Sequence, residues 1–363
     1  MRILLTNNTL RWRGGTEMYV LDVARRLQAL GHMPVAYSSE LGVAAEAIRV
    51  AGIPVVDDLT RLPFQPDIIH GQHHLETMTA LLCLPGVPAV YFCHGALPWQ
   101  ENAPSFPRIR RYVAVDQACF ERMICEQGIP EEKITTLLNF VDLKRFQPRP
   151  PLPIKPHRAL IYSVGNPDIE KTIRAACAGA GLELDILGNL ATNTVGAPEK
   201  ILPRYDLIFA KGRAALESMA VGCAVIPFTG RGCGPLVSLK NFDTLRRLNF
   251  GYRTGRSDVT VDFIASQIAQ YDAADATAVS ARIRTEADMH HTVDRIVELY
   301  ADAIAEQRET PSDPAAESRA AGIYFQSSLP SFKRAPQRGL SSKYRLFEKW
   351  ARKADKLSAW LRS

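Results

Sequence analysis

Short, nearly continuous apolar runs alternate along the chain with stretches in which apolar residues recur every three or four positions. The first kind is typical of strands buried on both faces of a sheet, and the second of amphipathic helices such as Met18 to Leu30. The strands expected in the first half are Arg2–Thr6, Pro34–Tyr37, Ile53–Val56, Ile68–His70, Ala89–Cys93 and Tyr112–Val115. The alternation predicts a parallel sheet covered by helices on both faces.

A proline-rich segment divides this pattern into two parts. Gln147–His157 contains five prolines in eleven residues, which excludes regular helix or strand interior there. Beyond it we expect strands at Ala159–Val164, Leu184–Leu187, Tyr205–Phe209 and Ala224–Phe228, helices at Glu170–Ala180 and Ala214–Val221, and a mostly helical stretch at Asp262–Glu306. The chain should therefore be an α/β protein of two doubly wound, Rossmann-like lobes, residues 1–147 and 158–309, with a linker at 148–157. Ligands bind such sheets beyond the carboxyl ends of the strands, so a cleft between the lobes is the expected site.

Composition narrows the class of protein. The 363 residues suffice for two domains, and 46% apolar with 23% charged residues is ordinary for a soluble globular protein. The pattern contains no apolar run long enough to span a membrane and no signal peptide, so we expect a cytoplasmic protein. Seven cysteines, an odd number without a C-x-x-C pair, indicate reduced thiols rather than a zinc or redox site.

The net charge of +6 is concentrated at the end of the chain. Residues 343–363 hold seven basic and two acidic side chains, with apolar residues on one helical face, which is typical of a helix on an anionic membrane surface. A helix that docks on the body or on another subunit is the alternative. Residues 310–342, rich in Pro, Ser, Ala, Glu and Arg, are expected to be a flexible tether. The remainder is about neutral, which argues against a nucleic-acid-binding protein.

One glycine pair follows the first expected strand and precedes a helix. Exposed amides and the positive end of a helix favour phosphate at Gly14 and Gly15, although many such turns contain glycine for geometry alone. The sequence there is not G-x-G-x-x-G, which argues against a nicotinamide or flavin oxidoreductase.

Several segments in this order resemble the family-4 retaining glycosyltransferases, which have the GT-B fold. The opening is GGTEMYVLDVARRLQALGHMPVAYS, and the later segments are DIIHGQHH, VPAVYFCHG, RYVAVDQACFERMICEQGIPEEKITTLLNFVDLKRFQP, LIYSVGNPDIEKTIRAA and FAKGRAALESMAVGCAVI. The resemblance covers roughly residues 1–300. It implies two lobes that face a central cleft, with the acceptor on the first and a nucleotide sugar on the second. The last long helix is expected to cross back to the first lobe, as in relatives.

The resemblance also implies roles for individual residues. His94 matches a histidine beside the transferred sugar, Lys171 a lysine that neutralises the leaving diphosphate, and Glu217 the second glutamate of an E-x7-E pair that holds the ribose. The implied donor-binding and phosphate-binding residues are Gly14, Gly15, Gly165, Lys211, Gly212 and Arg213.

Each of these candidates has a plainer interpretation. Lys171 fits an ordinary helix-surface lysine, and His94 a turn residue. Glu217 lies in an otherwise apolar helix and needs a partner. No metal or other cofactor is implied. His70, His73 and His74 do not favour a metal site, because no carboxylate or cysteine lies at a matching helical spacing.

Two positions depart from the family pattern. The first glutamate of the pair would fall at Phe209, and a family arginine at Asn166. Lys211 or Arg213 could supply the missing cation. The expected function is transfer of a sugar from a UDP- or GDP-sugar to an acceptor, with retained stereochemistry, in polysaccharide or lipid-linked glycan synthesis. The alternatives are an inactive binding partner of an active transferase, and an enzyme that acts on nucleotide sugars without transfer.

Overall fold

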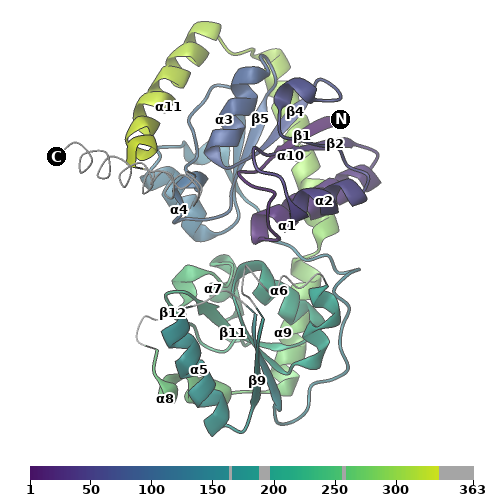
Figure 1. Ribbon diagram of the computed structural model, residues 1–363, viewed down its shortest axis with the longest axis vertical. Coiled ribbons are helices and arrows are strands. Elements are labelled where there is room, and N and C mark those ends of the chain that lie inside the picture. The colour runs from purple at the N-terminus through teal and green to yellow at the C-terminus, as the bar shows by residue number, and fades with distance from the viewer. Residues whose placement is uncertain (163–165, 188–196, 256–258, 335–363) are drawn as a thin grey trace, which may run out of the picture. The chain divides into compact units, whose positions relative to one another are not determined.

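The computed structural model describes residues 1–162, 166–187, 197–255 and 259–334, and side chains as far as residue 328. Residues 1–312 form one compact unit and residues 313–363 a second. The first unit contains a seven-stranded and a five-stranded sheet, each with its own helices (Figure 1). We call the seven-stranded sheet with its helices the first lobe, and the five-stranded sheet with its helices the second lobe.

The first lobe has an entirely parallel sheet in the order β3-β2-β1-β4-β5-β6-β7. Its strands are β1 (Arg2–Thr6), β2 (Met33–Tyr37), β3 (Val55–Val56), β4 (Ile68–Gln72), β5 (Ala89–Cys93), β6 (Ile109–Ala114) and β7 (Ile134–Thr136). Its helices include α1 (Gly15–Ala29), α2 (Val43–Val50), α3 (His74–Cys83) and α4 (Gln117–Cys125). The strand order reverses between β1 and β4, which is the place where a doubly wound sheet binds its ligand.

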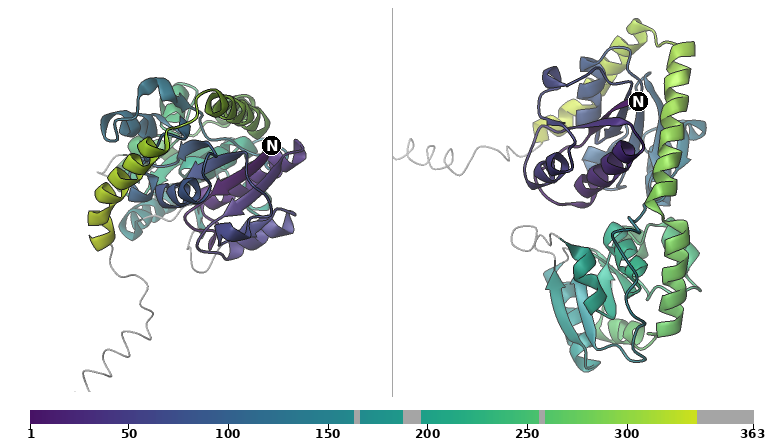
Figure 2. Two further views of the ribbon diagram at one scale, coloured as in Figure 1. Left: turned by 90° about the horizontal axis from the view of Figure 1, so that it is seen from above. Right: turned by 90° about the vertical axis from the view of Figure 1, so that its right-hand side faces the viewer.

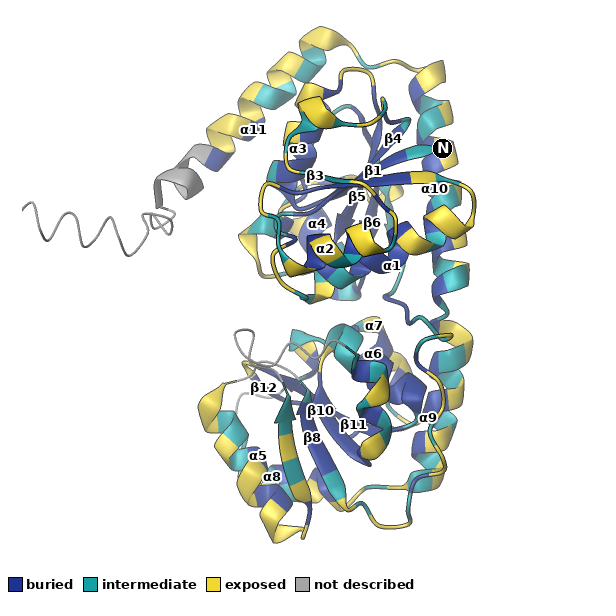
Figure 3. Ribbon diagram, turned by 45° about the vertical axis from the view of Figure 1, so that its right-hand side comes forward, coloured by how far each residue is buried: buried dark blue, intermediate teal, exposed yellow. Residues whose placement is uncertain are grey.

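The second lobe has the strand order β12-β11-β10-β8-β9, and β12 alone is antiparallel. Its strands are β8 (Arg158–Tyr162), β9 (Glu183–Leu187), β10 (Leu207–Ala210), β11 (Ala224–Thr229) and β12 (Gly232–Cys233). Its helices are α5 (Pro167–Gly179), α6 (Gly212–Val221), α7 (Phe242–Arg247), α8 (Val261–Ile268) and α9 (Ala273–Glu286). Side chains of β10 alternate between two apolar layers, with Leu207 and Phe209 in one and Ile208 and Ala210 in the other. Burial is concentrated in the strands and the inner faces of the helices (Figure 3).

The chain crosses between the lobes twice, and the two crossings lie side by side. The N–H of Val141 donates to the carbonyl of Ala287, and its carbonyl accepts the N–H of Met289. These two bonds form an isolated parallel bridge between Val141 and Asp288. Asp288 then caps α10 (Met289–Glu309), which returns to the first lobe and packs on β4, β5, β6 and α1 (Figure 2). The expected return of the last long helix to the first lobe is confirmed. The expected boundary of the second lobe at residue 309 is corrected, because residues 289–309 pack with the first lobe.

Buried contacts hold α10 in place. Val293, Ile296 and Ala303 are fully buried in the core of the first lobe. The hydroxyl of Tyr300 lies 2.5 Å from Nδ1 of His70, a fully buried residue of β4 that stacks on Phe92 with ring centroids 3.7 Å apart.

The expected tether at 310–342 differs from the structure, because residues Pro314–Arg334 form a helix, α11. The oxygens of Asp313 accept the N–H groups of Ala315 and Ala316, and Pro314 suits the first helical position. Alanine-rich sequence then continues the helix. The basic segment 343–363 lies outside the described residues. None of the helices in the described ranges is long and apolar enough to cross a membrane.

The contact between Tyr300 and His70 makes a stability prediction. Replacing Tyr300 by Phe keeps the ring but leaves Nδ1 of buried His70 without its partner, so the free energy of unfolding should fall by about 1–3 kcal/mol. Tyr300→Ala also removes the ring and should cost about 3–5 kcal/mol. Urea unfolding followed by circular dichroism measures both variants. Equal stability of Tyr300→Phe and the unchanged protein would contradict the assigned hydrogen bond.

Candidate active site

The loop before α1 brings two glycines and a buried carboxylate together. Gly14 is the N-cap of α1, and a Cβ atom added there would lie 2.5 Å from Oε2 of Glu17, so a larger residue would displace that carboxylate. Gly15 has open space around it. Thr16 Oγ1 donates to Glu17 at 3.1 Å. Glu17 is buried, and burial raises the pKa of its carboxyl above the ordinary range.

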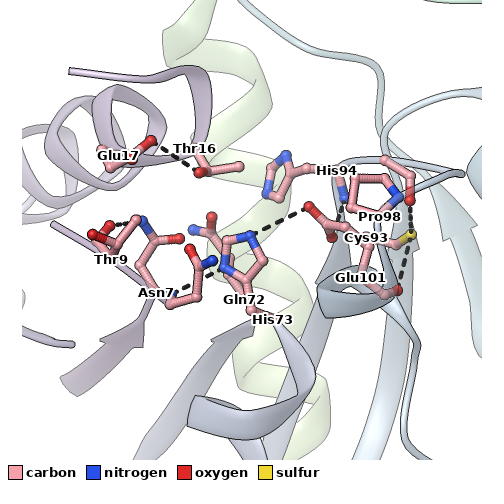
Figure 4. Close-up of polar contacts among 12 residues, drawn as sticks. Asn7, Thr9, Thr16, Glu17, Gln72, His73, Cys93, His94, Pro98 and Glu101 are labelled. Atoms are coloured by element: carbon pink, nitrogen blue, oxygen red, sulfur yellow. Dashed lines mark hydrogen bonds and ion pairs between the residues drawn. The ribbon is translucent and has the colours of Figure 1, made fainter. Parts of the chain in front are cut away.

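A buried histidine at the end of β4 holds a second carboxylate. His73 is the N-cap of α3 with φ of 61°, a left-handed conformation that non-glycine residues rarely adopt. The N–H of Asn8 donates to Nδ1 of His73 at 3.1 Å, so the ring proton must be on Nε2, which lies 3.4 Å from Oε1 of Glu101. Figure 4 shows this contact between the His73 ring and the Glu101 carboxylate.

Glu101 in turn positions the loop after β5. Its Oε2 accepts the backbone N–H of His94 at 2.9 Å, and it is 3% exposed. Burial opposes the negative charge, but the hydrogen bonds from His73 and His94 outweigh burial and lower the pKa of Glu101. A strained histidine, a carboxylate and a loop amide therefore form one connected chain.

His94 lies where the sequence placed it, at the end of β5. Its ring meets Tyr19 of α1 edge-on, with centroids 4.4 Å apart. Burial lowers the pKa of His94 from 6.5 to about 4, so the imidazole is neutral at physiological pH. Within the described part of the chain, its Nε2 is buried without a hydrogen-bond partner. This nitrogen is available to a ligand.

The three histidines His70, His73 and His74 each have different partners. His70 bonds Tyr300 and Gln72, His73 bonds Asn8 and Glu101, and the ring of His74 meets Trp99 edge-on. Among the residues that the structure describes, no cluster of histidine, cysteine or carboxylate side chains has the arrangement of a metal site.

In the second lobe α6 begins directly after β10. Lys211 is its exposed N-cap residue, and Gly212 is its first residue, with φ of 53°. The N–H of Gly212 donates to the carbonyl of Phe250 at 3.4 Å. The left-handed conformation at this position favours glycine, because a side chain would be strained there.

Arg213 and Glu217 form a buried ion cluster with a residue of the first lobe. The same nitrogen of Arg213 lies 2.5 Å from Oδ2 of Asp22 on α1 and 3.3 Å from Oε1 of Glu217, one turn along α6. Burial opposes the charge of Arg213, but the two carboxylates hold its pKa above the ordinary value. Burial raises the pKa of Glu217, and Arg213 only partly offsets this. Glu217 thus has the partner that its apolar helix requires.

Other candidates lie apart from this cluster. Lys171 is a surface residue of α5, 80% exposed in its side chain, and Asp168 at 3.5 Å is its ion-pair partner. Gly165 lies outside the described residues. Phe209 is fully buried in an apolar layer, so a carboxylate at this position would enter the core. Asn166 is the N-cap of α5 and accepts the N–H of Asp168 at 2.9 Å.

Sequence analysis did not single out Asp22, Glu101 or a role for His73 in holding a carboxylate. Asp22 stands among apolar residues of a helix, and that pattern alone signals a carboxylate in need of a partner. No spacing connects His73 with Glu101, because their contact depends on a loop of irregular conformation.

A family model matches the first lobe, and solved structures share the fold of both lobes. Residues 13–145 match the family model described as Glycosyltransferase Family 4. A glycosyltransferase from Rickettsia africae has a TM-score of 0.60 at 15% identity, over 84% of this chain and 98% of its own. HepE from Anabaena, in complex with UDP and glucose, has a TM-score of 0.58 at 16% identity, over 83% of this chain and 100% of its own. A putative UDP-N-acetylglucosamine 2-epimerase from Listeria monocytogenes has a TM-score of 0.50 at 10% identity, over 86% of this chain and 97% of its own.

These likenesses show the GT-B fold, as expected from the sequence. A search of curated protein sequences finds no match.

The environment of His94 predicts a pH dependence. Its pKa is lower in the folded protein, about 4, than the ordinary 6.5, so between these values the unfolded chain binds a proton that the folded protein does not. Stability should therefore fall as the pH falls, with His94 contributing about 1–2 kcal/mol between pH 7 and pH 5. Urea unfolding at both pH values should show a smaller difference for His94→Asn. The same pH dependence in both proteins would contradict the assignment.

Proposed function

Because the chain is family-4-like over its first lobe and has the GT-B fold, we propose that it is a glycosyltransferase. It takes a sugar from a nucleotide diphosphate sugar, a UDP- or GDP-sugar, and transfers it to an acceptor with retained stereochemistry.

The observation that carries this proposal is the buried carboxylate of Glu217 beside Arg213 at the start of α6. α6 follows β10, so both residues lie near the carboxyl edge of the second sheet, where doubly wound sheets bind nucleotides. A carboxylate can accept both hydroxyls of a ribose. Burial removes water from the carboxylate of Glu217 and raises its pKa, so hydrogen bonds donated by hydroxyl groups would stabilise its charged form.

Fixed cations suit the chemistry of the leaving group. Cleavage of the bond between the sugar and the phosphate develops negative charge on the diphosphate, and preorganised cations and helix-terminal amides stabilise it. Arg213 and Lys211 stand at the N-terminus of α6, and Gly212 lets that backbone approach closely. Exposed Lys171 on α5 is a further candidate that would have to reorient toward the donor.

The two departures from the family pattern have structural explanations in this protein. Phe209 fills an apolar layer, and Asn166 caps a helix. The charge of Arg213 is balanced by Asp22 and Glu217, so the cation left for a donor phosphate at the start of α6 is that of the exposed N-cap residue Lys211. A catalytically inactive partner that binds sugar nucleotides is the alternative, and turnover separates the two.

The acceptor class rests on the sequence of the tail. The basic segment 343–363 favours an acceptor at an anionic membrane surface, such as a lipid-linked glycan or growing polysaccharide at the inner face of the membrane.

The first experiment is a thermal-shift screen against UDP, GDP, ADP, CMP and their common sugar conjugates. UDP is the first nucleotide to test, because the structure of HepE from Anabaena contains UDP. A ligand of the folded state raises the melting temperature by mass action, so one nucleotide family should give a clear shift. Glu217→Gln should abolish most of that shift, whereas Glu309→Gln, at an exposed carboxylate of α10, should keep it.

Turnover then decides between the functions. With the donor identified, release of nucleotide with transfer of the sugar to added glycan or lipid fractions supports the transferase, and NMR of the product reports its anomeric configuration. Nucleotide binding without turnover would favour the inactive partner. A changed sugar without any acceptor would favour an epimerase-like enzyme. No shift with any nucleotide, in a folded protein, would contradict the proposal.

The tail makes a separate prediction. Deleting residues 338–363 should weaken binding to vesicles of phosphatidylcholine with phosphatidylglycerol, because it removes the whole net positive charge of the chain. Vesicles of phosphatidylcholine alone serve as the control. Cosedimentation that is unchanged by the deletion would contradict the membrane role.

A further inference from the structure

Arg122 of α4 binds the loop that follows β5, residues 94–102, which we call the β5 loop. Its Nη1 donates to the carbonyls of Gly95 at 3.0 Å and Pro98 at 2.9 Å, and its Nη2 donates to the side chain of Asn102. The guanidinium is buried, and a charge removed from water has to keep such partners. The β5 loop therefore keeps the position that α4 gives it.

The β5 loop begins at His94, so a movement of this loop also moves the imidazole ring. Glu101 lies in the same loop and accepts the N–H of His94 at 2.9 Å, which joins the two ends of the loop (Figure 4). Gln127, two residues beyond the end of α4, accepts the N–H of Ala103 at 3.1 Å. The loop is thus held from α4 at both of its ends, and a shift of this helix would carry His94 with it.

Another face of α4 contacts the second lobe. Gln117 and Glu121 lie one turn apart on this helix, and Nε2 of Gln117 donates to Oε1 of Glu121 at 3.1 Å. Arg247, the last residue of α7, donates to Oε1 of Gln117 at 3.4 Å. Arg253 forms an ion pair with Oε2 of Glu121. Helix α4 therefore has one set of contacts with the β5 loop and a second set with the other lobe.

The segment of the second lobe that meets α4 contains a strained turn. Asn249 has φ of 52° and Phe250 has φ of 49°, so two consecutive residues other than glycine adopt the left-handed conformation. Such strain persists only where the surrounding contacts fix it, and it is typical of functional sites and switch segments. Phe250 is fully buried, and its carbonyl accepts the N–H of Gly212, the first residue of α6, at 3.4 Å. The strained turn thus lies between the start of α6 and Arg253, which contacts α4.

We propose that α4 couples the position of the second lobe to that of His94. Arg253 and Glu121 form the link between the lobes, and Arg122 is a positioning residue that extends this link to the β5 loop. The inference rests on the proposed function, which places the donor diphosphate at the start of α6. A diphosphate that draws this backbone toward itself would move the strained turn, and the displacement would reach His94 through contiguous contacts. These contacts exist without any ligand, so they are tested without one.

The test is hydrogen–deuterium exchange of the full chain without nucleotide, read by mass spectrometry in the peptide that contains the β5 loop. Glu121→Gln and Arg253→Gln each remove the ion pair, which is partly exposed and contributes modestly, so exchange of this peptide should become about threefold faster. The double variant should be no faster than either single one, since both changes remove the same contact. Glu132→Gln, at an exposed carboxylate of the first lobe, is the matched control and should leave the exchange unchanged.

Two further variants separate the possible results. The charge-reversed pair, Glu121→Arg with Arg253→Glu, should restore slow exchange of the β5 loop, whereas Glu121→Arg alone should not. Arg122→Met removes the bonds to the loop directly and should give a larger increase than Glu121→Gln, with melting curves to show that each variant is folded. The partly exposed position of Glu121 keeps the test valid if Arg122→Met does not fold.

Three results would overturn the inference. They are unchanged exchange of the β5 loop in both Glu121→Gln and Arg253→Gln, an equal increase in Glu132→Gln, and fast exchange that the charge-reversed pair does not correct. The nucleotide screen with Glu217→Gln is a separate measurement on another residue. Failure of the proposed function would appear in that screen, and failure of the coupling would appear in the exchange of the loop.

Discussion

The buried charge of Arg213 constrains the arrangement of both lobes around the candidate site. A guanidinium that is removed from water must be paired, and its carboxylate partners come from different lobes, Asp22 on α1 and Glu217 on α6. Breaking the contact with Asp22 would leave a charge of the first lobe buried without its partner. The ion cluster therefore favours the arrangement in which the helices after β1 and β10 meet. These are the helices whose N-termini carry the glycines expected to approach a ligand.

The path of the chain supports the same arrangement. The segments at Val141 and Asp288 cross between the lobes together and bond to each other, so neither crossing moves alone. α10 then anchors the returning chain under the first sheet, where Tyr300 bonds His70. His70 also lies within hydrogen-bond distance of Gln72, the last residue of β4. The crossing helix thus contributes to the orientation of a residue at the sheet edge.

Much of the fold could be predicted from the sequence, because parallel strands buried on both faces leave a clear signal. The apolar runs at Arg2–Thr6 and Ala89–Cys93 match β1 and β5 residue for residue. The eight-residue helix α2 and the three-residue strand β7 were not predicted, since such short elements show little periodicity. Helix α11 was missed because its composition resembles that of a tether, and the capping by Asp313 becomes evident only in the structure.

The site could be predicted only in part, and the reason is physical. His94 and Glu217 were singled out by family resemblance, and their roles stay predictions. Their partners were not singled out, because the Glu101–His73 contact depends on a left-handed residue and the Asp22–Arg213 contact joins α1 to α6 across 191 positions of sequence. The family pattern also treats Phe209 as a lost carboxylate, whereas the alternation of β10 places its side chain in the core.

The two edges differ in chemistry in a way that suits a transfer reaction. The second lobe offers the exposed cation of Lys211 at the N-terminus of α6, and the first offers the uncharged His94 ring near the buried carboxyl of Glu17. A diphosphate that gains negative charge is stabilised at the edge of the second lobe and repelled at the edge of the first. A hydroxyl-bearing acceptor has the opposite preference. Since His94 is kept neutral by burial, it can accept a hydroxyl proton in a hydrogen bond without adding a positive charge between the two edges. In the proposed reaction, this difference in charge favours the diphosphate of the donor at the second lobe and the uncharged acceptor at the first.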